Sequence, residues 1–255
     1  MIYIKFFINK KYLTIGLLIL IFLIVFIVIL LLKSCNTETS NVVVETPIDV
    51  HGTVCIDAGH GGSDTGAIST DGSIYEKDDN LKLALKVKEY LENMGIVVVM
   101  TRQDDIYLDL NERCKIANTY DTKVDLFVSL HRNSAENVSA RGVEIWVHNS
   151  KPPVDVDLAE NILNNLLSIP NQEDRGIEYG YRGDSSENYR INKLTTMPSC
   201  LVETGFITNV DDVNMFNNNL DDFAMSISMG IYQTLEDIAR DNVDTSRGKS
   251  GQNWN

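Results

Sequence analysis

Three short apolar segments of this chain each lead into a residue that can bind a metal ion or carry a proton. The segments and their end residues are 53–57 before His60, 125–130 before His131, and 199–202 before Glu203. A fourth such residue, Glu76, stands before an amphipathic segment. In open α/β sheets, functional groups collect at the carboxyl ends of parallel strands, where loops open onto a crevice. The pattern therefore predicts a parallel sheet that brings these four residues to one edge.

Strand-like and helix-like segments alternate through the rest of the chain. We predict strands at 53–57, 96–100, 125–130, 143–147 and around 201–202, and helices at 78–94, 109–120, 156–167 and 220–239. The polar, glycine-containing segment 171–195 is interpreted mainly as loop. This alternation is typical of a single α/β domain, with a mainly parallel twisted sheet flanked by helices on both faces.

Two of these elements carry more detailed predictions. The helix at 78–94 is expected to take Asp78 or Asp79 as its N-cap, which leaves Glu76 in the preceding loop. The continuous β-branched run at 96–100 is typical of a strand buried on both faces.

The N-terminal part of the chain differs in kind, because residues 13–32 are apolar and uncharged. At about 1.5 Å per helical residue, this segment matches the roughly 30 Å hydrocarbon core of a bilayer. A cleaved signal peptide is the alternative, but its apolar region spans only about 7–15 residues and precedes a small-residue cleavage site. Lys33 stands where a lipoprotein cleavage motif has a small or apolar residue, although lipidation of Cys35 remains an alternative. We predict an uncleaved transmembrane helix.

Charge predicts the orientation of that helix. Lys5, Lys10 and Lys11 precede it and only Lys33 follows directly, so the positive-inside rule keeps the N-terminus cytoplasmic. We expect a single-pass protein of the cell membrane with an extracytoplasmic folded domain. The expected parts are a cytoplasmic N-terminus (1–12), a transmembrane anchor (13–32), a linker (33–51), the folded domain (52–240) and a disordered tail (241–255).

Composition excludes one class of partner. With 36 acidic against 22 basic residues and a formal net charge of −14, the chain lacks the basic excess that nucleic-acid binding requires. The four cysteines show no close spacing of the kind found in thiolate metal sites or redox motifs. Buried free thiols are the favoured interpretation, and a disulfide stays open.

The four end residues suggest metal chemistry. Two imidazoles and a carboxylate from His60, Glu76 and His131 suit Zn²⁺ with a fourth position left for water, and a second carboxylate, Glu203, suits proton transfer. Each has an ordinary structural alternative, such as a histidine in a tight turn or a solvated glutamate at a helix start. For Asp57 and Asp64 the alternatives are support of the site and the structure of a glycine-rich loop.

Several motifs, in order, resemble the zinc-dependent N-acetylmuramoyl-L-alanine amidases of the amidase type 3 family. The matching segments are 56–67 (IDAGHGGSDTGA), Glu76 with 80–81, 101–105 with 108–113, 129–134 (SLHRNS) and 198–209 (PSCLVETGFITN). The resemblance implies zinc bound by His60, Glu76 and His131, with Glu203 as the catalytic carboxylate. It also implies hydrolysis of the amide bond between the lactyl group of N-acetylmuramic acid and L-alanine in peptidoglycan.

Arg132 departs from the family, which commonly has a smaller residue there, and is expected to add a cation beside the metal motif and to alter substrate preference. The stretch between Val147 and Ser199 shows no extra insertion that would block the site, so we expect an open site. We also expect a monomer. An activator protein is possible, and its identity is unknown. Three alternatives remain open: a catalytically silent wall-binding protein of the same fold, another zinc peptidoglycan hydrolase (endopeptidase or deacetylase), and, within the amidases, the spore-germination type.

Overall fold

The computed structural model describes residues 20–24, 26–28 and 49–250. Within these residues no helix is both long and apolar enough to cross a membrane. Of the predicted anchor at 13–32, only 20–24 and 26–28 are described, and they are helical. The remainder of the anchor, the N-terminus and most of the linker lie outside the described residues. The chain separates into units 1–47 and 48–255, and the second holds the sheet domain.

The domain contains a six-stranded sheet in the order β2-β1-β3-β6-β4-β5. The strands are β1 (Thr53–Ala58), β2 (Val97–Met100), β3 (Leu126–Asn133), β4 (Val143–Val147), β5 (Asp174–Tyr179) and β6 (Ser199–Phe206). All neighbouring pairs are parallel except β4 with β6. The predicted single α/β domain with a mainly parallel sheet is confirmed.

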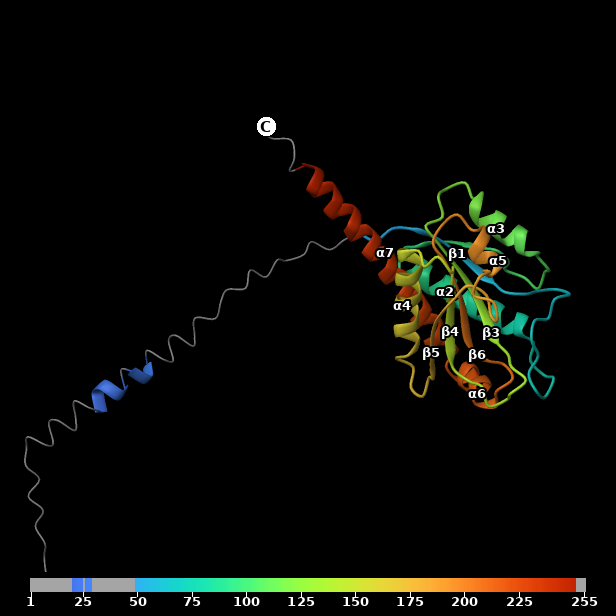
Figure 1. Ribbon diagram of the computed structural model, residues 1–255, viewed down its shortest axis with the longest axis horizontal. Coiled ribbons are helices and arrows are strands. Elements are labelled where there is room, and N and C mark those ends of the chain that lie inside the picture. Colours follow the sequence, from blue (N-terminus) through green and yellow to red (C-terminus); the bar gives the residue numbers. More distant parts are fainter. Residues whose placement is uncertain (1–19, 25, 29–48, 251–255) are drawn as a thin grey trace, which may run out of the picture. The chain divides into compact units, whose positions relative to one another are not determined.

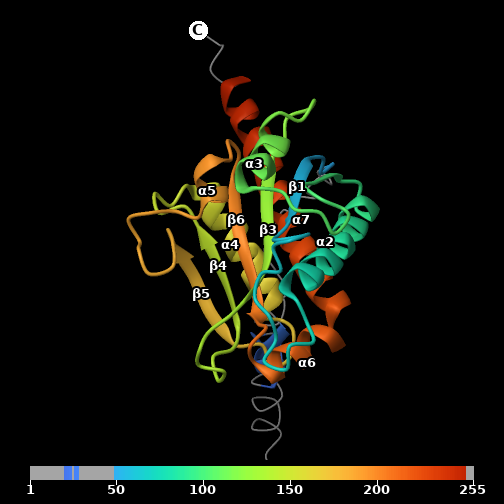
Figure 2. The ribbon, with the colours of Figure 1, turned by 90° about the vertical axis from the view of Figure 1, so that its right-hand side faces the viewer.

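Helices cover both faces of the sheet. They are α2 (Glu76–Asn93), α3 (Leu110–Asn118), α4 (Pro153–Leu166), α5 (Arg190–Leu194), α6 (Val210–Asn218) and α7 (Leu220–Ser250). Helices α2, α4 and α7 pack together on one face, while α3 and α5 pack on the other (Figures 1 and 2).

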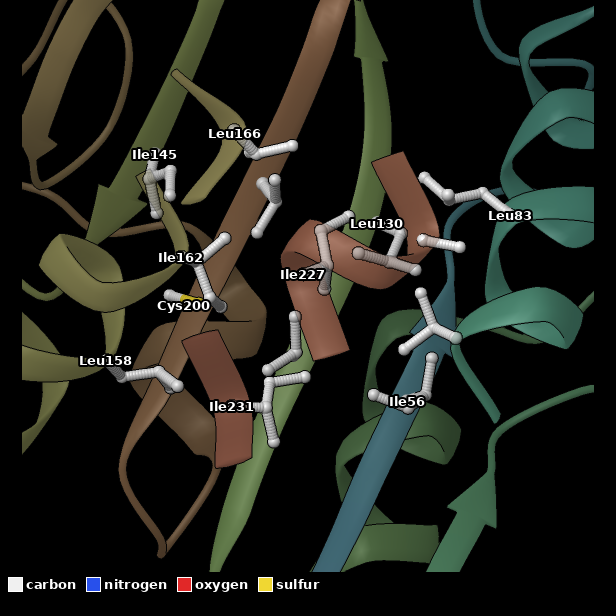
Figure 3. Close-up of a cluster of buried hydrophobic side chains, with 14 of the residues drawn as sticks. Ile56, Leu83, Leu130, Ile145, Leu158, Ile162, Leu166, Cys200, Ile227 and Ile231 are labelled. Carbon is white, nitrogen blue, oxygen red and sulfur yellow. The ribbon is translucent and has the colours of Figure 1, made fainter. Parts of the chain in front are cut away.

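The larger core lies between the sheet and the first group of helices (Figure 3). It joins strand residues Ile56, Leu130, Ile145 and Cys200 to Leu83 of α2, to Leu158, Ile162 and Leu166 of α4, and to Ile227 and Ile231 of α7. Burial of each large aliphatic side chain contributes about 1.5–3 kcal/mol. This core holds the central strands rigidly, and it is these strands that carry the candidate site at their ends.

Two detailed predictions about single elements were wrong, one about the start of α2 and one about the burial of β2. Helix α2 begins at Glu76 with Tyr75 as its N-cap, so Glu76 lies in the first helical turn and neither Asp78 nor Asp79 is the cap. Asp79 instead faces inward, because it pairs with the buried Arg132. Strand β2 lies at the edge of the sheet, and Val97 is 51% exposed, so it is not buried on both faces.

Two segments have more regular structure than predicted. The polar segment 171–195 contains edge strand β5 and the short helix α5, because an edge strand needs few apolar residues. Helix α7 continues to Ser250, so the predicted disordered tail is helical at 241–250. Elongation of a helix already nucleated by packing is inexpensive even without apolar periodicity. Residues 251–255 lie outside the described part.

Candidate active site

The site lies at the carboxyl ends of three adjacent strands, β1, β3 and β6. His131 and Glu203 are direct neighbours in the parallel register of β3 and β6. His60 follows β1 by two residues, and the Gly59 N–H, next to it, donates to the Leu130 carbonyl at 3.1 Å. The sheet therefore brings together three of the four predicted residues, and the first turn of α2 supplies Glu76.

The side chains of His60, Glu76 and His131 converge. Their potential ligand atoms all lie within 4.8 Å of one another. Glu76 Oε1 lies 3.2 Å from His60 Nε2 and 2.9 Å from His131 Nδ1, and the two imidazole rings meet edge to face. Two neutral imidazole nitrogens and a carboxylate oxygen form a donor set typical of catalytic zinc sites. These three residues therefore fit a zinc ion.

A carboxylate fixes the ring of His60. Asp64 Oδ2 accepts a hydrogen bond from His60 Nδ1 at 2.8 Å, while Asp64 Oδ1 accepts one from the Gly66 N–H at 3.1 Å. Metal-binding histidines usually donate their other ring N–H to such a group, which sets the tautomer and orientation of the ring. Asp64 thus combines the two roles considered from the sequence, since it supports the histidine and shapes the glycine-rich loop.

Two glycines leave the space that the site needs. A Cβ atom on Gly59 would lie 2.3 Å from the His131 ring. At Gly66, whose φ is +62°, a Cβ atom would lie 2.7 Å from both Glu76 and His60. A side chain at either position would displace the candidate metal ligands, which explains why the loop is rich in glycine.

Two buried arginines hold the backbone of the His60 loop. Arg102 donates to the carbonyls of Ala58 and Gly59, and Arg113 donates to those of Ala58 and His60 at 2.7 Å each. Arg113 also pairs with the buried Asp57 at 2.8 Å. These contacts hold His60 in a left-handed conformation, with φ of 61°. Asp57 therefore serves the structure of the loop and does not contact the candidate metal ligands.

The two glutamates of the site have opposite electrostatic environments. Burial disfavours ionised Glu76, yet hydrogen bonds from His131 and His60 lower the pKa of Glu76 below its usual range. Burial raises the pKa of Glu203 to about 7, and the charge of Glu76 adds to this effect while His131 opposes it. Glu203 Oε2 is buried and has no hydrogen-bond partner among the described residues. A carboxylate with a pKa near neutrality is suited to accept and release a proton.

These residues line one pocket of about 410 Å³. The pocket also includes Arg182, Tyr189 and Arg190, which the sequence analysis did not single out. Arg182 Nη2 lies 2.8 Å from Glu144 and 3.6 Å from Glu203. The sequence held one signal for this group, because Glu144 is a charged residue inside an apolar strand. Helix α4 lies in the stretch between Val147 and Ser199, where no blocking insertion was expected. Among the described residues, none from α4 lines the pocket.

The prediction that Arg132 presents a cation to the candidate metal ligands was wrong, whereas its effect on substrate preference stays a prediction. Its side chain is fully buried, pairs with Asp79 at 2.7 Å and lies 4.2 Å from the centre of the Phe216 ring. Successive side chains of a strand point to opposite faces, so the residue after His131 points away from the candidate metal ligands. Only its backbone contributes to the site, through an N–H that donates to Glu76 at 3.2 Å.

An α/β domain with a His–Glu–His group at the carboxyl ends of its strands has the features of a metal-dependent hydrolase. The Amidase_3 family model, described as N-acetylmuramoyl-L-alanine amidase, matches residues 54–233, and the chain belongs to this family.

Similar proteins are also named as amidases. The chain is 35% identical over 171 residues to the probable cell wall amidase LytH of Staphylococcus aureus, covering 66% of this chain and 52% of that protein. It thus spans about half the length of this relative. The N-acetylmuramoyl-L-alanine amidase of Clostridium difficile 630 has a TM-score of 0.67 and 33% identity, covering 74% of this chain and 98% of that one. The CwlD amidase of Clostridioides difficile, solved in complex with the GerS lipoprotein, has a TM-score of 0.64 and 27% identity, covering 72% and 98%.

Proposed function

We propose that this protein is a zinc-dependent hydrolase that cleaves the amide bond between the lactyl group of N-acetylmuramic acid and L-alanine in peptidoglycan. The observation that carries the proposal is the convergence of His60, Glu76 and His131 beside the buried Glu203, in a chain of the amidase family. The pocket lies at the carboxyl ends of the strands, where a substrate can approach from the loops.

His60, Glu76 and His131 would hold the zinc ion. When bound, zinc acts as a Lewis acid and lowers the pKa of water toward about 7. Asp64 keeps Nδ1 of His60 engaged, so that Nε2 of the same ring stays directed toward Glu76 and the candidate metal position. The chain thus orients its donor atoms before any substrate arrives.

Glu203 would carry the proton of the reaction. Its carboxylate, which lines the pocket, accepts a proton from the water that attacks the lactyl carbonyl. The same carboxyl group then passes the proton to the departing nitrogen of L-alanine, which leaves with a free amine while the glycan stays intact. Because burial raises the pKa of Glu203 to about 7, both the acceptance and the release of a proton are accessible near neutral pH.

We also propose that residues 13–32 anchor the protein in the cell membrane and place the amidase domain outside the cytoplasm. Their length, apolar character and flanking lysines support this proposal. The likeness to a CwlD amidase solved in complex with a lipoprotein supports testing for a protein partner.

The proposal is tested with the full-length chain in detergent, incubated with peptidoglycan with and without a zinc chelator. Newly exposed amino groups are labelled, and the residue that carries them is identified. We expect new L-alanine termini that vanish on chelation and return with zinc. New termini on another amino acid would indicate an endopeptidase, and free amines on the sugar a deacetylase. No new amines despite bound zinc would contradict the proposal and favour a silent wall-binding protein.

A further inference from the structure

Two arginines present unused hydrogen-bond donors to the candidate active site. Arg182 and Arg190 both line the pocket that contains Glu203. Arg182 uses only Nη2 in its contacts with Glu144 and Glu203, and its side chain is 43% exposed. Arg190 uses Nε and Nη2 to donate to Asn111 at 3.1 and 2.8 Å. Within the described residues, Nε and Nη1 of Arg182 and Nη1 of Arg190 have no partner.

A buried carboxylate, that of Glu144, holds Arg182 in place. Glu144 is 3% exposed, and its Oε1 accepts hydrogen bonds from Arg182 at 2.8 Å and from the indole N–H of Trp146 at 3.0 Å. Its Oε2 accepts one from Arg175 at 2.7 Å. Glu144 lies opposite Glu203 in the antiparallel register of β4 and β6, so the sheet itself sets the position of Arg182 beside the pocket.

The loop that carries Arg182 is also held by aromatic packing. The ring of Tyr181 packs at a tilt against that of Tyr189 with centroids 4.8 Å apart, and Tyr189 packs edge-on against Trp146 at 5.4 Å. The Gly180 N–H donates to the Val147 carbonyl at 2.9 Å, which ties the start of the loop to β4. Arg182 is therefore preorganised, and little side-chain freedom is lost when its free donors bind a ligand.

The chemistry of these donors selects an anion. A guanidinium N–H without a partner in the protein forms a strong, charge-assisted hydrogen bond with a carboxylate, so the free donors of Arg182 favour an anionic group. Nη2 of Arg182 lies 3.6 Å from Glu203 Oε1, so the guanidinium group stands beside the proposed proton carrier, and a substrate group bound by it belongs to the part of the stem close to the bond that is cleaved. In a peptidoglycan stem that position holds the acidic residue after L-alanine.

We propose that Arg182, aided by Arg190, recognises the α-carboxylate of the second stem-peptide residue and so makes the enzyme selective for stems in which this group is free. This inference rests on the proposed function and adds a specificity-determining residue to it. Amidation of that carboxylate removes the charge and one acceptor, so the modified stem leaves a guanidinium group of the pocket without its partner.

The test compares two zinc-loaded full-length proteins, wild type and Arg182→Gln, on two muramoyl tripeptides. The substrates differ only at the second residue, which carries a free α-carboxylate in one and a carboxamide in the other. We expect wild type to favour the acid by about tenfold or more in kcat/KM, mainly through KM, because a charged hydrogen bond is lost with the amide. Arg182→Gln should lose this preference. Arg182→Lys should keep part of it, because lysine retains the positive charge but not the planar, directed N–H donors of the guanidinium group.

Arg175→Gln is the matched control, since it also removes an arginine from Glu144 but does not line the pocket. It should keep the preference for the acid. An equal fall of both substrates in Arg182→Gln would overturn the inference, because it would show that Arg182 serves Glu203 instead of the substrate. The inference would also be overturned if Arg175→Gln lost the preference for the acid substrate to the same extent as Arg182→Gln.

A binding measurement separates failure of this inference from failure of the proposed function. If wild type cleaves neither substrate and also releases no L-alanine termini from peptidoglycan, the amidase assignment fails. Calorimetry with the two free stem tripeptides then decides the inference by itself. If Arg182→Gln binds the acidic peptide about tenfold more weakly than wild type does, the inference that Arg182 recognises the carboxylate is supported. Equal affinity of wild type and variant for the acidic peptide overturns it.

Discussion

Two sides of the pocket each hold a buried glutamate, and the surroundings shift the pKa values of the two carboxyl groups in opposite directions. On the α2 side, Glu76 accepts hydrogen bonds at both oxygens, from the Ala67 N–H at 2.8 Å and from His131 at 2.9 Å, among others. On the β6 side, Glu203 has one oxygen without a partner and meets Arg182 only at 3.6 Å. Both side chains are almost fully buried, so burial alone does not explain their different pKa directions.

The difference fits the two chemical tasks proposed for these residues. A carboxylate that binds a metal has to stay ionised, and hydrogen-bond donors around Glu76 favour the charged form. A carboxylate that carries a proton has to change its charge during turnover, and Glu203 lacks the donors that would hold it ionised. Partner groups, and not depth of burial, therefore distinguish the two roles, and four variants test this comparison.

The largest effect is expected from Glu203→Gln, which removes the proposed proton carrier and keeps the shape of the side chain. Turnover of peptidoglycan should fall by about 10²–10⁴-fold, the usual contribution of a positioned acid or base. Zinc content and melting temperature should stay near those of wild type. Kinetics with metal analysis measures both, and Glu178→Gln on the exposed face of β5 is the control. Retained turnover would show that another group carries the proton.

A loss of stability is expected from Arg113→Met in α3, because the Arg113 side chain holds the His60 loop. The change leaves Asp57 buried without its cation and removes two donors from the His60 loop. Removing one partner of a buried ion pair costs about 3–5 kcal/mol in the free energy of unfolding. Urea denaturation measures this, with the exposed Lys115→Met of the same helix as control. A change below about 1 kcal/mol would mean that the loop is held by other contacts.

A smaller effect is expected from Asp64→Asn, which weakens the orientation of His60 without removing a candidate ligand. Loss of such a supporting carboxylate lowers metal affinity by about 10–100-fold. Competition with a zinc chelator measures the affinity, and Asp71→Asn in the neighbouring exposed turn serves as control. Unchanged affinity would assign Asp64 to the loop alone.

The smallest effect is expected at Asp155, a buried carboxylate away from the pocket. Burial raises the pKa of Asp155 to about 6 from a usual value of 3.8. Because the folded state binds this proton more tightly than the unfolded state, the ionised group costs stability as pH rises from 3.8 through 6. Asp155→Asn should therefore raise stability at pH 7.5 by about 1–2 kcal/mol and by much less at pH 4.

Thermal unfolding at the two pH values measures this difference, with the exposed Asp157→Asn as control. An equal effect at both values would mean that the charge of Asp155 is not what burial penalises. A stabilising Asp155→Asn beside an inactivating Glu203→Gln would show that the same kind of buried carboxylate is a cost in one region and a functional group in the other.

Much of the candidate site was predictable because it depends on local patterns. Apolar runs that end in His60, His131 or Glu203 identify strand ends, and parallel strands bring their carboxyl ends to one edge. The glycines around His60 were a further local signal, since each leaves room that a side chain would fill. Glu76 was found as well, although its place in the helix was not.

The errors arose where a residue's direction or neighbours decide its role. Arg132 follows His131 directly, yet the alternation of the strand turns it toward Asp79 and Phe216. Strand β5 is polar because it lies at an edge, so its composition resembled that of a loop. Arg182 contacts Glu144 and Glu203 across large separations in the chain, and no local pattern reports such contacts.

The sequence by itself determined the α/β alternation, the four candidate site residues and the absence of a basic excess for nucleic acid. These follow from periodicity, residue chemistry and charge, which are written locally along the chain. The tertiary structure alone decided which side of the strand Arg132 takes, which carboxylate is paired and which is not, and that Arg182 faces the pocket. Those properties depend on burial and on the distances between groups from different elements, and packing of the whole domain sets both.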